Sequence, residues 1–191
     1  MSIETDLQSV RGVLQKFQDG YLARDLSALE SFRALFVPDG HLEVIGTGAI
    51  QPGDFEWCLG PEAALTLVKN DWEGWGDLRL ALPSARIHIL GDVAWLAVTG
   101  TVTEQLGRDA AYQGYLDSLA AILADSQASP RSRLFEILRG AANTAFEGER
   151  GDQYVWPIRF TAVLVRRESA WLFHQIQFSF PTTRFPDVRS L

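Results

Sequence analysis

Several residue types that mark particular classes of protein are scarce in this chain. Cysteine occurs once in 191 residues, as Cys58, which excludes an intrachain disulfide and a cysteine-based zinc cluster. No apolar stretch is long enough to span a membrane, and the acidic start, Met-Ser-Ile-Glu-Thr-Asp, does not resemble a signal peptide. We therefore expect a cytoplasmic protein that does not contact a membrane, with Cys58 acting as a small buried hydrophobe.

Positive charge is also scarce. The formal net charge is −7, and only Lys16 and Lys69 among the 17 basic residues are lysines. A nucleic-acid partner is therefore not expected, because such binding depends on neutralising phosphates. The sequence contains no phosphate loop, dinucleotide fingerprint, kinase motif or nucleophile elbow. We expect no cofactor.

The composition, by contrast, is that of a globular domain. Hydrophobic residues make up 47% of the chain, and 191 residues can bury roughly 70% of their unfolded surface without a disulfide or a metal. We predict one domain over residues 1–191.

The first half of the chain is mainly helical. Apolar residues recur at helical spacing over 4–22, and a second short helix is predicted from a cap at Asp25. A turn at 38–40 leads into a strand over 41–45, and the glycine-rich segment 46–60 is predicted to be a loop. Pro61 begins a further helix that runs to about Trp72.

Strands dominate the second half. Residues 85–90 and 93–104 read as strands joined by a tight turn at Gly91-Asp92, and two further strands flank the polar turn 167–169. Between these pairs, residues 106–150 lack strand character and show helical spacing over 112–124 and 132–146. The order predicts an α+β fold in which a curved, mostly antiparallel sheet wraps the early helices, with a helical hairpin inserted at 106–150.

The final strand carries an unusual polar series, in which Gln175, Gln177 and Ser179 recur at period two. A strand with such a face either shows it to water or lines a pocket with it. The pattern therefore bears on fold and binding, and it does not identify a reaction.

Four stretches together resemble the NTF2-like superfamily, and within it the SnoaL-like group. They are Tyr21-Leu-Ala-Arg-Asp25, Phe36-x-x-Asp-Gly40, Gly91-Asp-Val-Ala-Trp95, and the final strand pair with Thr161 and Trp171 to Pro181. Relatives in this family end in a Trp followed at even spacings by His, His and Ser. Here the histidine positions hold Gln175 and Gln177, which cannot exchange protons near neutral pH.

The resemblance implies a cone-shaped pocket that holds a small organic molecule. Arg159 would hold an organic acid by its two-pronged guanidinium, unless it pairs with an internal acid instead. The resemblance implies that the pocket is lined by these residues: Tyr21, Trp72, Trp95, Thr99, Thr101, Arg159, Thr161, Trp171, Gln175, Gln177 and Ser179.

Three residues are candidates for proton transfer. Asp71 and Glu56 each adjoin a tryptophan, where desolvation raises the pKa of a carboxyl group into a useful range. His41 shares a strand face with Glu43 and forms a possible general base. Alternating polar residues more often mark a solvated strand face, so no metal site is expected here.

Three functions are therefore compatible with the residues. The first is a small-molecule-binding protein that forms a homodimer through its outer sheet face. The second is a cofactor-free acid–base enzyme, such as an isomerase, dehydratase or cyclase. The third is an assembly module without a ligand, and the hairpin over 106–150 is compatible with a lid, a dimer contact or a cover for its own subunit.

Overall fold

The computed structural model describes residues 3–53, 56–105, 107–149 and 152–180. The chain divides into two compact units. The first consists of residues 1–102 and 156–181, and the second consists of residues 103–155 and 182–191. Each unit is described by itself below.

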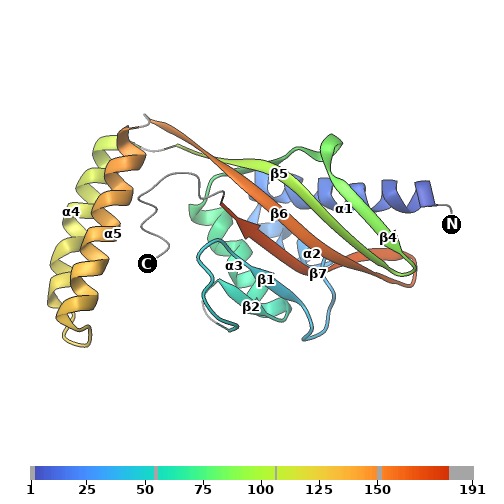
Figure 1. The fold of residues 1–191 in the computed structure, drawn as a ribbon, viewed down its shortest axis with the longest axis horizontal. Coiled ribbons are helices and arrows are strands. Elements are labelled where there is room, and N and C mark those ends of the chain that lie inside the picture. The colour runs from blue at the N-terminus through green and yellow to red at the C-terminus, as the bar shows by residue number, and fades with distance from the viewer. Residues whose placement is uncertain (1–2, 54–55, 106, 150–151, 181–191) are drawn as a thin grey trace. The chain divides into compact units, whose positions relative to one another are not determined.

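Seven strands form one mixed sheet that is curved and does not close (Figure 1). Their order is β2-β1-β7-β6-β5-β3, and β4 pairs with β5 outside this path. The β1–β7 pair is parallel, whereas β1–β2, β4–β5 and β6–β7 are antiparallel. The strands are β1 (Glu43–Ile45), β2 (Trp57–Leu59), β3 (Asp77–Leu80), β4 (Arg86–Leu90), β5 (Val93–Gln105), β6 (Gln153–Arg167) and β7 (Ala170–Ser179).

Helix α1 (Ile3–Ala23) covers one face of this sheet and buries the stripe predicted for it. Val10, Leu14, Phe17 and Tyr21 are all at most 1% exposed. The Phe17 ring lies 5.5 Å from that of Phe160 and 5.3 Å from that of Phe173, which fastens the helix to β6 and β7. The other helices of this unit are α2 (Leu29–Arg33), α3 (Pro61–Gly74) and the short 3-10 turns η1 (Leu26–Ala28) and η2 (Leu82–Ser84).

Both tight hairpins predicted from the sequence are present. Leu90 pairs with Val93 across Gly91-Asp92, and Gly91 has a φ of 58° that its lack of a side chain makes accessible. Arg167 pairs with Ala170, and Glu168 takes the corresponding left-handed conformation at 55°. Two short strands, β2 and β3, were not predicted, because three or four residues give too little alternation to recognise.

A β-bulge in β7 decides which side chains face α1. The pairing of β6 with β7 shifts between Val163 and Leu164, so that β7 contains one extra residue at His174. Before the bulge Trp171 and Phe173 are buried, and after it Ile176 and Phe178 are buried. A one-residue shift exchanges the two faces of a strand, so the polar series of β7 faces away from α1.

An ion pair joins the two ends of the first unit. Arg166 Nη2 donates to Asp6 Oδ2 at 2.6 Å, and Arg166 Nε lies 3.3 Å from Asp92 Oδ1. The guanidinium also stacks over the Trp171 ring at 4.5 Å. The hydrogen bond from Arg166 is the main cause that lowers the pKa of Asp6.

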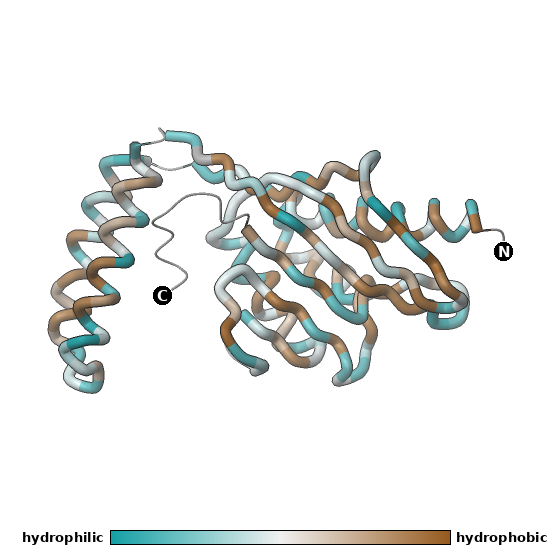
Figure 2. The backbone as a smooth tube through the Cα atoms, viewed as in Figure 1, coloured by the Kyte–Doolittle hydropathy of each residue, from teal (hydrophilic) through white to brown (hydrophobic). Residues whose placement is uncertain are grey.

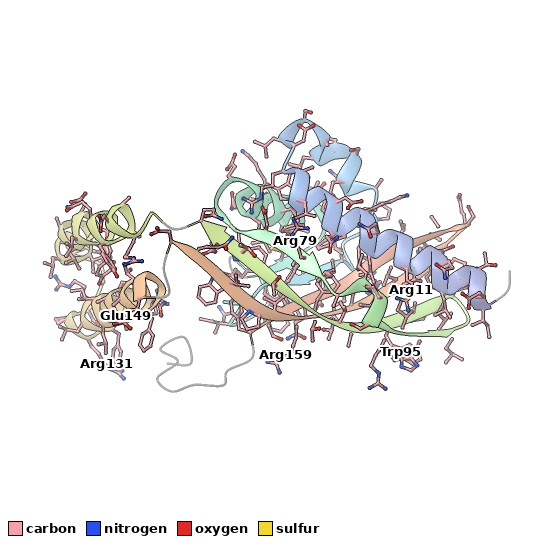
Figure 3. The ribbon with its side chains drawn as sticks, turned by 90° about the horizontal axis from the view of Figure 1, so that it is seen from above. Arg11, Arg79, Trp95, Arg131, Glu149 and Arg159 are labelled. Carbon is pink, nitrogen blue, oxygen red and sulfur yellow. The ribbon has the colours of Figure 1, made fainter. Side chains whose placement is uncertain are left out.

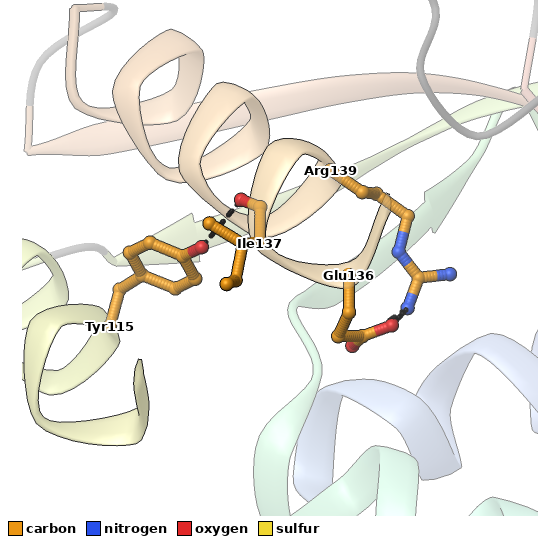
Figure 4. Close-up of polar contacts among 4 residues, drawn as sticks. All are labelled: Tyr115, Glu136, Ile137 and Arg139. Atoms are coloured by element: carbon orange, nitrogen blue, oxygen red, sulfur yellow. Dashed lines mark hydrogen bonds and ion pairs between the residues drawn. The ribbon is translucent and has the colours of Figure 1, made fainter. Parts of the chain in front are cut away.

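The second unit contains α4 (Arg108–Ala124) and α5 (Pro130–Glu149), which form an antiparallel pair. The Tyr115 hydroxyl donates to the Ile137 carbonyl at 2.5 Å, and Glu136 and Arg139 form an ion pair on α5 (Figure 4). A side chain at Gly140 would collide with the Tyr115 ring, so this glycine permits the close approach of the two helices. Within the described part of the chain, no helix has the length and apolarity needed to cross a membrane.

Candidate functional site

Tyr21 and Asp71 form a hydrogen-bonded pair inside the first unit. Tyr21 is in the last turn of α1 and is 1% exposed, and Asp71 is near the end of α3. The Tyr21 hydroxyl donates to Asp71 Oδ2 at 2.8 Å. Both residues were predicted from the sequence, Tyr21 as a pocket residue and Asp71 as an acid or base, and the structure brings them together.

The surroundings of Asp71 disfavour its charged form. The pKa of this carboxyl is raised to about 7, mainly by desolvation and to a smaller extent by the negative charge of Glu56. The Tyr21 hydrogen bond and the Arg24 charge act in the opposite direction without cancelling these effects. Burial and the neighbouring Asp71 keep the pKa of Tyr21 far above 10, so its hydroxyl stays a donor.

Aromatic rings enclose the pair. The Trp75 ring lies 6.2 Å from Tyr21 and 5.8 Å from Phe178, in edge-to-face contacts with both. The Trp72 ring also contacts Tyr21 edge to face, with 6.4 Å between the ring centroids. The rings pack around Tyr21, the hydrogen-bond partner of Asp71, and burial is the main cause of the raised pKa of this carboxyl group.

Arg24, the first residue after α1, lies beside the pair. It adopts a φ of 50°, its Nε donates to the Tyr21 carbonyl at 3.3 Å, and its Nη2 lies 3.4 Å from Asp77 Oδ1. Sequence reasoning used Arg24 only as part of the Tyr21–Asp25 motif and gave it no role. The Arg-Asp dipeptide that follows the predicted helix is the feature of the sequence that could have indicated Arg24 as a site residue.

The other two acid–base candidates lie in different settings. The Glu56 carboxylate accepts from the Gly48 N–H and holds the loop at Gly46–Gly48. It therefore acts on Asp71 through its charge. His41 is exposed in a turn, where its backbone N–H donates to Asp39 Oδ1 at 3.0 Å.

Most of the predicted pocket residues lie on the outer face of the sheet, opposite α1. In β5 the buried residues are Ala94, Leu96, Val98 and Val102, and in β6 they are Ile158, Phe160, Ala162 and Leu164. The intervening side chains point outward, and Figure 3 shows Trp95 and Arg159 on this side. The following residues were predicted to line the cone pocket but lie on the outer face instead: Trp95, Thr99, Thr101, Arg159, Thr161, Gln175, Gln177 and Ser179.

These outward residues have partners of their own. Arg159 Nη2 donates to the Phe180 carbonyl at 2.8 Å, so its guanidinium is not directed into the cone. Gln175 Nε2 donates to Glu43 Oε2 at 3.3 Å. Of the predicted lining, Tyr21, Trp72 and Trp171 are buried on the inner side, and Trp171 contacts Arg166 rather than the Tyr21–Asp71 pair.

The outer face contains a groove of about 450 Å³. His88 and Trp95 are cross-strand partners that stack at 5.6 Å, and Trp95 is 44% exposed. The groove is lined by Arg86, His88, Trp95, Leu96, Ala97, Thr161, Ala162, Val163 and Gln175. No group of three or more His, Cys, Asp and Glu side chains suited to a metal occurs among the described residues.

No family model and no curated protein matches this sequence. Solved structures do match its fold. An NTF2-like superfamily protein of Salmonella enterica aligns over 97% of this chain and 99% of its own, with a TM-score of 0.60 and 11% identity. A dehydratase candidate of the NTF2-like family from Streptomyces avermitilis aligns over 95% and 100%, with a TM-score of 0.58 and 12% identity.

A scytalone dehydratase candidate of Novosphingobium aromaticivorans aligns over 93% of this chain and 85% of its own, with a TM-score of 0.56 and 9% identity. The chain therefore has the NTF2-like fold. At these identities the likeness establishes the fold and leaves the function to the residues of the site.

Proposed function

We propose that this protein binds a small, largely apolar molecule beside Tyr21 and Asp71 and that Asp71 transfers a proton of that molecule without a cofactor. The observation that carries this proposal is the carboxyl group with a pKa of about 7 in an aromatic setting. The reaction class would be an isomerisation or an elimination of water. This favours the acid–base enzyme over the simple binding protein.

The chemistry follows from the protonation of Asp71. An acid or base works best when its pKa is close to the working pH, because both forms are then populated. Near pH 7, neutral Asp71 would donate a proton to a leaving hydroxyl, and charged Asp71 would remove a C–H proton beside a carbonyl. The Tyr21 hydroxyl orients the carboxyl oxygen at 2.8 Å in either state.

The surroundings of the pair suggest the nature of the ligand. Trp75 and Phe178 favour a flat apolar body, and Arg24 supplies the nearby positive charge that was predicted for Arg159. A small cyclic ketone or hydroxy compound fits this combination. Dehydratase names among the structural neighbours agree with this class and carry no weight beyond the shared fold.

Deuterium exchange tests the proposal. Small cyclic ketones and hydroxy ketones that raise the melting temperature of the wild type would be incubated with it in D₂O, and exchange followed by proton NMR. We expect exchange by the wild type that increases as the pH rises through 7, with Asp71→Asn binding the same compounds without exchanging them. Asp19→Asn, an exposed aspartate on α1, is the matched control. Equal exchange by wild type and Asp71→Asn would contradict the proposal.

We also propose that the protein is a homodimer through the outer sheet face. The exposed His88–Trp95 stack and its groove form an aromatic surface of the kind found at the centre of protein interfaces. Trp95→Glu should then abolish association through this face and lower the molecular mass in light scattering, whereas Leu26→Glu, at an exposed leucine of η1, should leave the mass of the wild type. A Trp95→Glu variant with the mass of the wild type would rule out this interface.

A further inference from the structure

The helical hairpin α4–α5 exposes four leucines on one of its faces. Leu116 and Leu123 of α4 are 57% and 58% exposed, and Leu134 and Leu138 of α5 are 68% and 55% exposed. The spacing continues through exposed alanines, as 116, 120 and 123 on α4 and as 134, 138, 141 and 145 on α5. Steps of four and three residues are those of a helix–helix seam.

The two stripes lie on the same side of the hairpin. On each helix the stripe is roughly a quarter turn from the residues that contact the other helix, in the same rotational sense. Tyr115 and Ile137 mark those contacts, and Arg133 Nη1, which donates to the Leu123 carbonyl at 2.8 Å, shows that the helices run antiparallel. Antiparallel helices with this offset place both stripes on one face.

The opposite face of the hairpin is different in character. It presents Asp117 and Ala121 of α4 with Ser132 and Glu136 of α5, all exposed. The hairpin is therefore amphipathic as a pair of helices, although α4 alone has apolar residues around much of its circumference. Apolar and polar segments alternate along both helices in Figure 2. A face of this kind requires a cover.

We propose that the leucine face of α4–α5 binds the same face of a second copy of this chain, so that two hairpins form a four-helix bundle. The face is chemically self-complementary. Its leucines gather toward the turn between the helices, which we call the tip, and Ala141 and Ala145 lie toward the opposite end, which we call the base. If the tip of one copy packs on the base of the other, large side chains meet small ones. Such a twofold contact uses one patch twice.

Charge at the rim supports the same arrangement. Asp109 is at the base of α4 and Arg131 is at the tip of α5, on the side of the leucine face. Tip over base places Arg131 of each copy beside Asp109 of the other. Two helices side by side over about 17 residues give a face of roughly 500 Å² in projection, and its corrugated surface approaches the 800 Å² per partner of a stable interface.

Sedimentation of the full chain tests the pairing, with each variant also made in a Trp95→Glu background so that association through the sheet face does not contribute. We expect Leu134→Glu/Leu138→Glu to raise the dissociation constant at least about 100-fold. Ala121→Glu/Ser132→Glu adds the same charges to the polar face and should leave it unchanged. Circular dichroism confirms that each variant is folded.

A charge exchange tests the orientation. Arg131→Glu should weaken association roughly threefold to tenfold at low salt, and adding Asp109→Arg should restore it. The two positions are about 20 Å apart within one hairpin, so restoration requires contact between copies. The pairing is overturned if the wild type stays monomeric or if the leucine variant keeps its mass. A leucine variant that loses only melting temperature shows that the chain covers this face itself, and a charge exchange without restoration rejects tip over base.

Discussion

The first unit contains two aspartates whose pKa values are shifted in opposite directions. Asp6 is paired with Arg166 at 2.6 Å, and the guanidinium lowers the pKa of the carboxyl. Asp71 has a neutral hydroxyl at 2.8 Å as its partner, and desolvation raises its pKa to about 7. A carboxylate in a direct ion pair stabilises a fold at neutral pH, whereas a desolvated carboxyl group without such a pair costs stability there and gains a proton that it can exchange.

The largest expected effect comes from breaking the charged pair. Arg166→Met leaves Asp6 without its cation and removes the group stacked on Trp171, so the melting temperature should fall by roughly 10 °C at pH 7. Arg167→Met is the matched control, because Arg167 is 59% exposed and lies 3.8 Å from Asp39. Equal losses in the two variants, measured by calorimetry, would contradict the comparison.

Asp71→Asn should instead increase the stability of the protein at neutral and alkaline pH. The pKa of Asp71 is raised in the folded state, so its favourable contribution is complete below the ordinary value of 3.8 and is lost as the pH rises through about 7. Asp71→Asn should therefore be more stable than the wild type at pH 8, by about 2–4 kcal/mol at 1.36 kcal/mol per pKa unit, and equal to it near pH 4. Urea unfolding at both pH values measures this difference.

Asp6→Asn sharpens that contrast. The pKa of Asp6 is lowered in the folded state, so its contribution is present above 3.8 and disappears as the pH falls through the lowered value. The variant should melt several degrees below the wild type at pH 7 and close to it at about pH 2. Parallel pH profiles for the Asp6 and Asp71 variants would remove the distinction between the two sites.

Smaller effects should follow from changing the partners of Asp71. Tyr21→Phe removes the hydrogen bond that lowers the pKa of Asp71, and that pKa should rise by about one unit in a carbon NMR titration. Tyr115→Phe removes a tyrosine hydroxyl from the hairpin and should leave the Asp71 titration unchanged. A fall in the pKa with Tyr21→Phe would refute the assigned role of the hydroxyl.

The smallest effect should come from Glu56. Removing its charge in Glu56→Gln should lower the pKa of Asp71 by less than about one unit, and salt should reduce this effect. Glu73→Gln removes an exposed charge that is paired with Lys69, and it should cause no comparable change. The same NMR titration distinguishes the two.

Local signals in the sequence predicted much of this fold. The apolar stripe of α1, the start of α3 at Pro61 and the tight turns at Gly91 and Glu168 each depend on neighbouring residues, and all are present. Asp71 was identified because a carboxyl beside tryptophans suggests desolvation. These features required no knowledge of distant contacts.

The sequence did not predict correctly which side chains of β5, β6 and β7 point toward α1. Nothing in the residues around His174 marks an extra residue in β7, and the shift appears only when β7 is paired with β6. The alternation in β5 and β6 was assigned by analogy, with the polar side placed inward. The alternate apolar residues of these strands are buried, which shows that packing against α1 determines which side faces inward. They include Ala94, Leu96, Val98, Ile158, Phe160 and Ala162.

The Asp6–Arg166 contact also has a kinetic consequence. Its partners are 160 positions apart, and because closing so long a loop is entropically costly, we expect them to meet after the sheet and α1 have assembled. An interaction absent from the folding transition state changes the unfolding rate and leaves the folding rate nearly constant. The pair thus slows unfolding. The Arg166→Met variant should therefore unfold faster than the wild type and refold at the same rate.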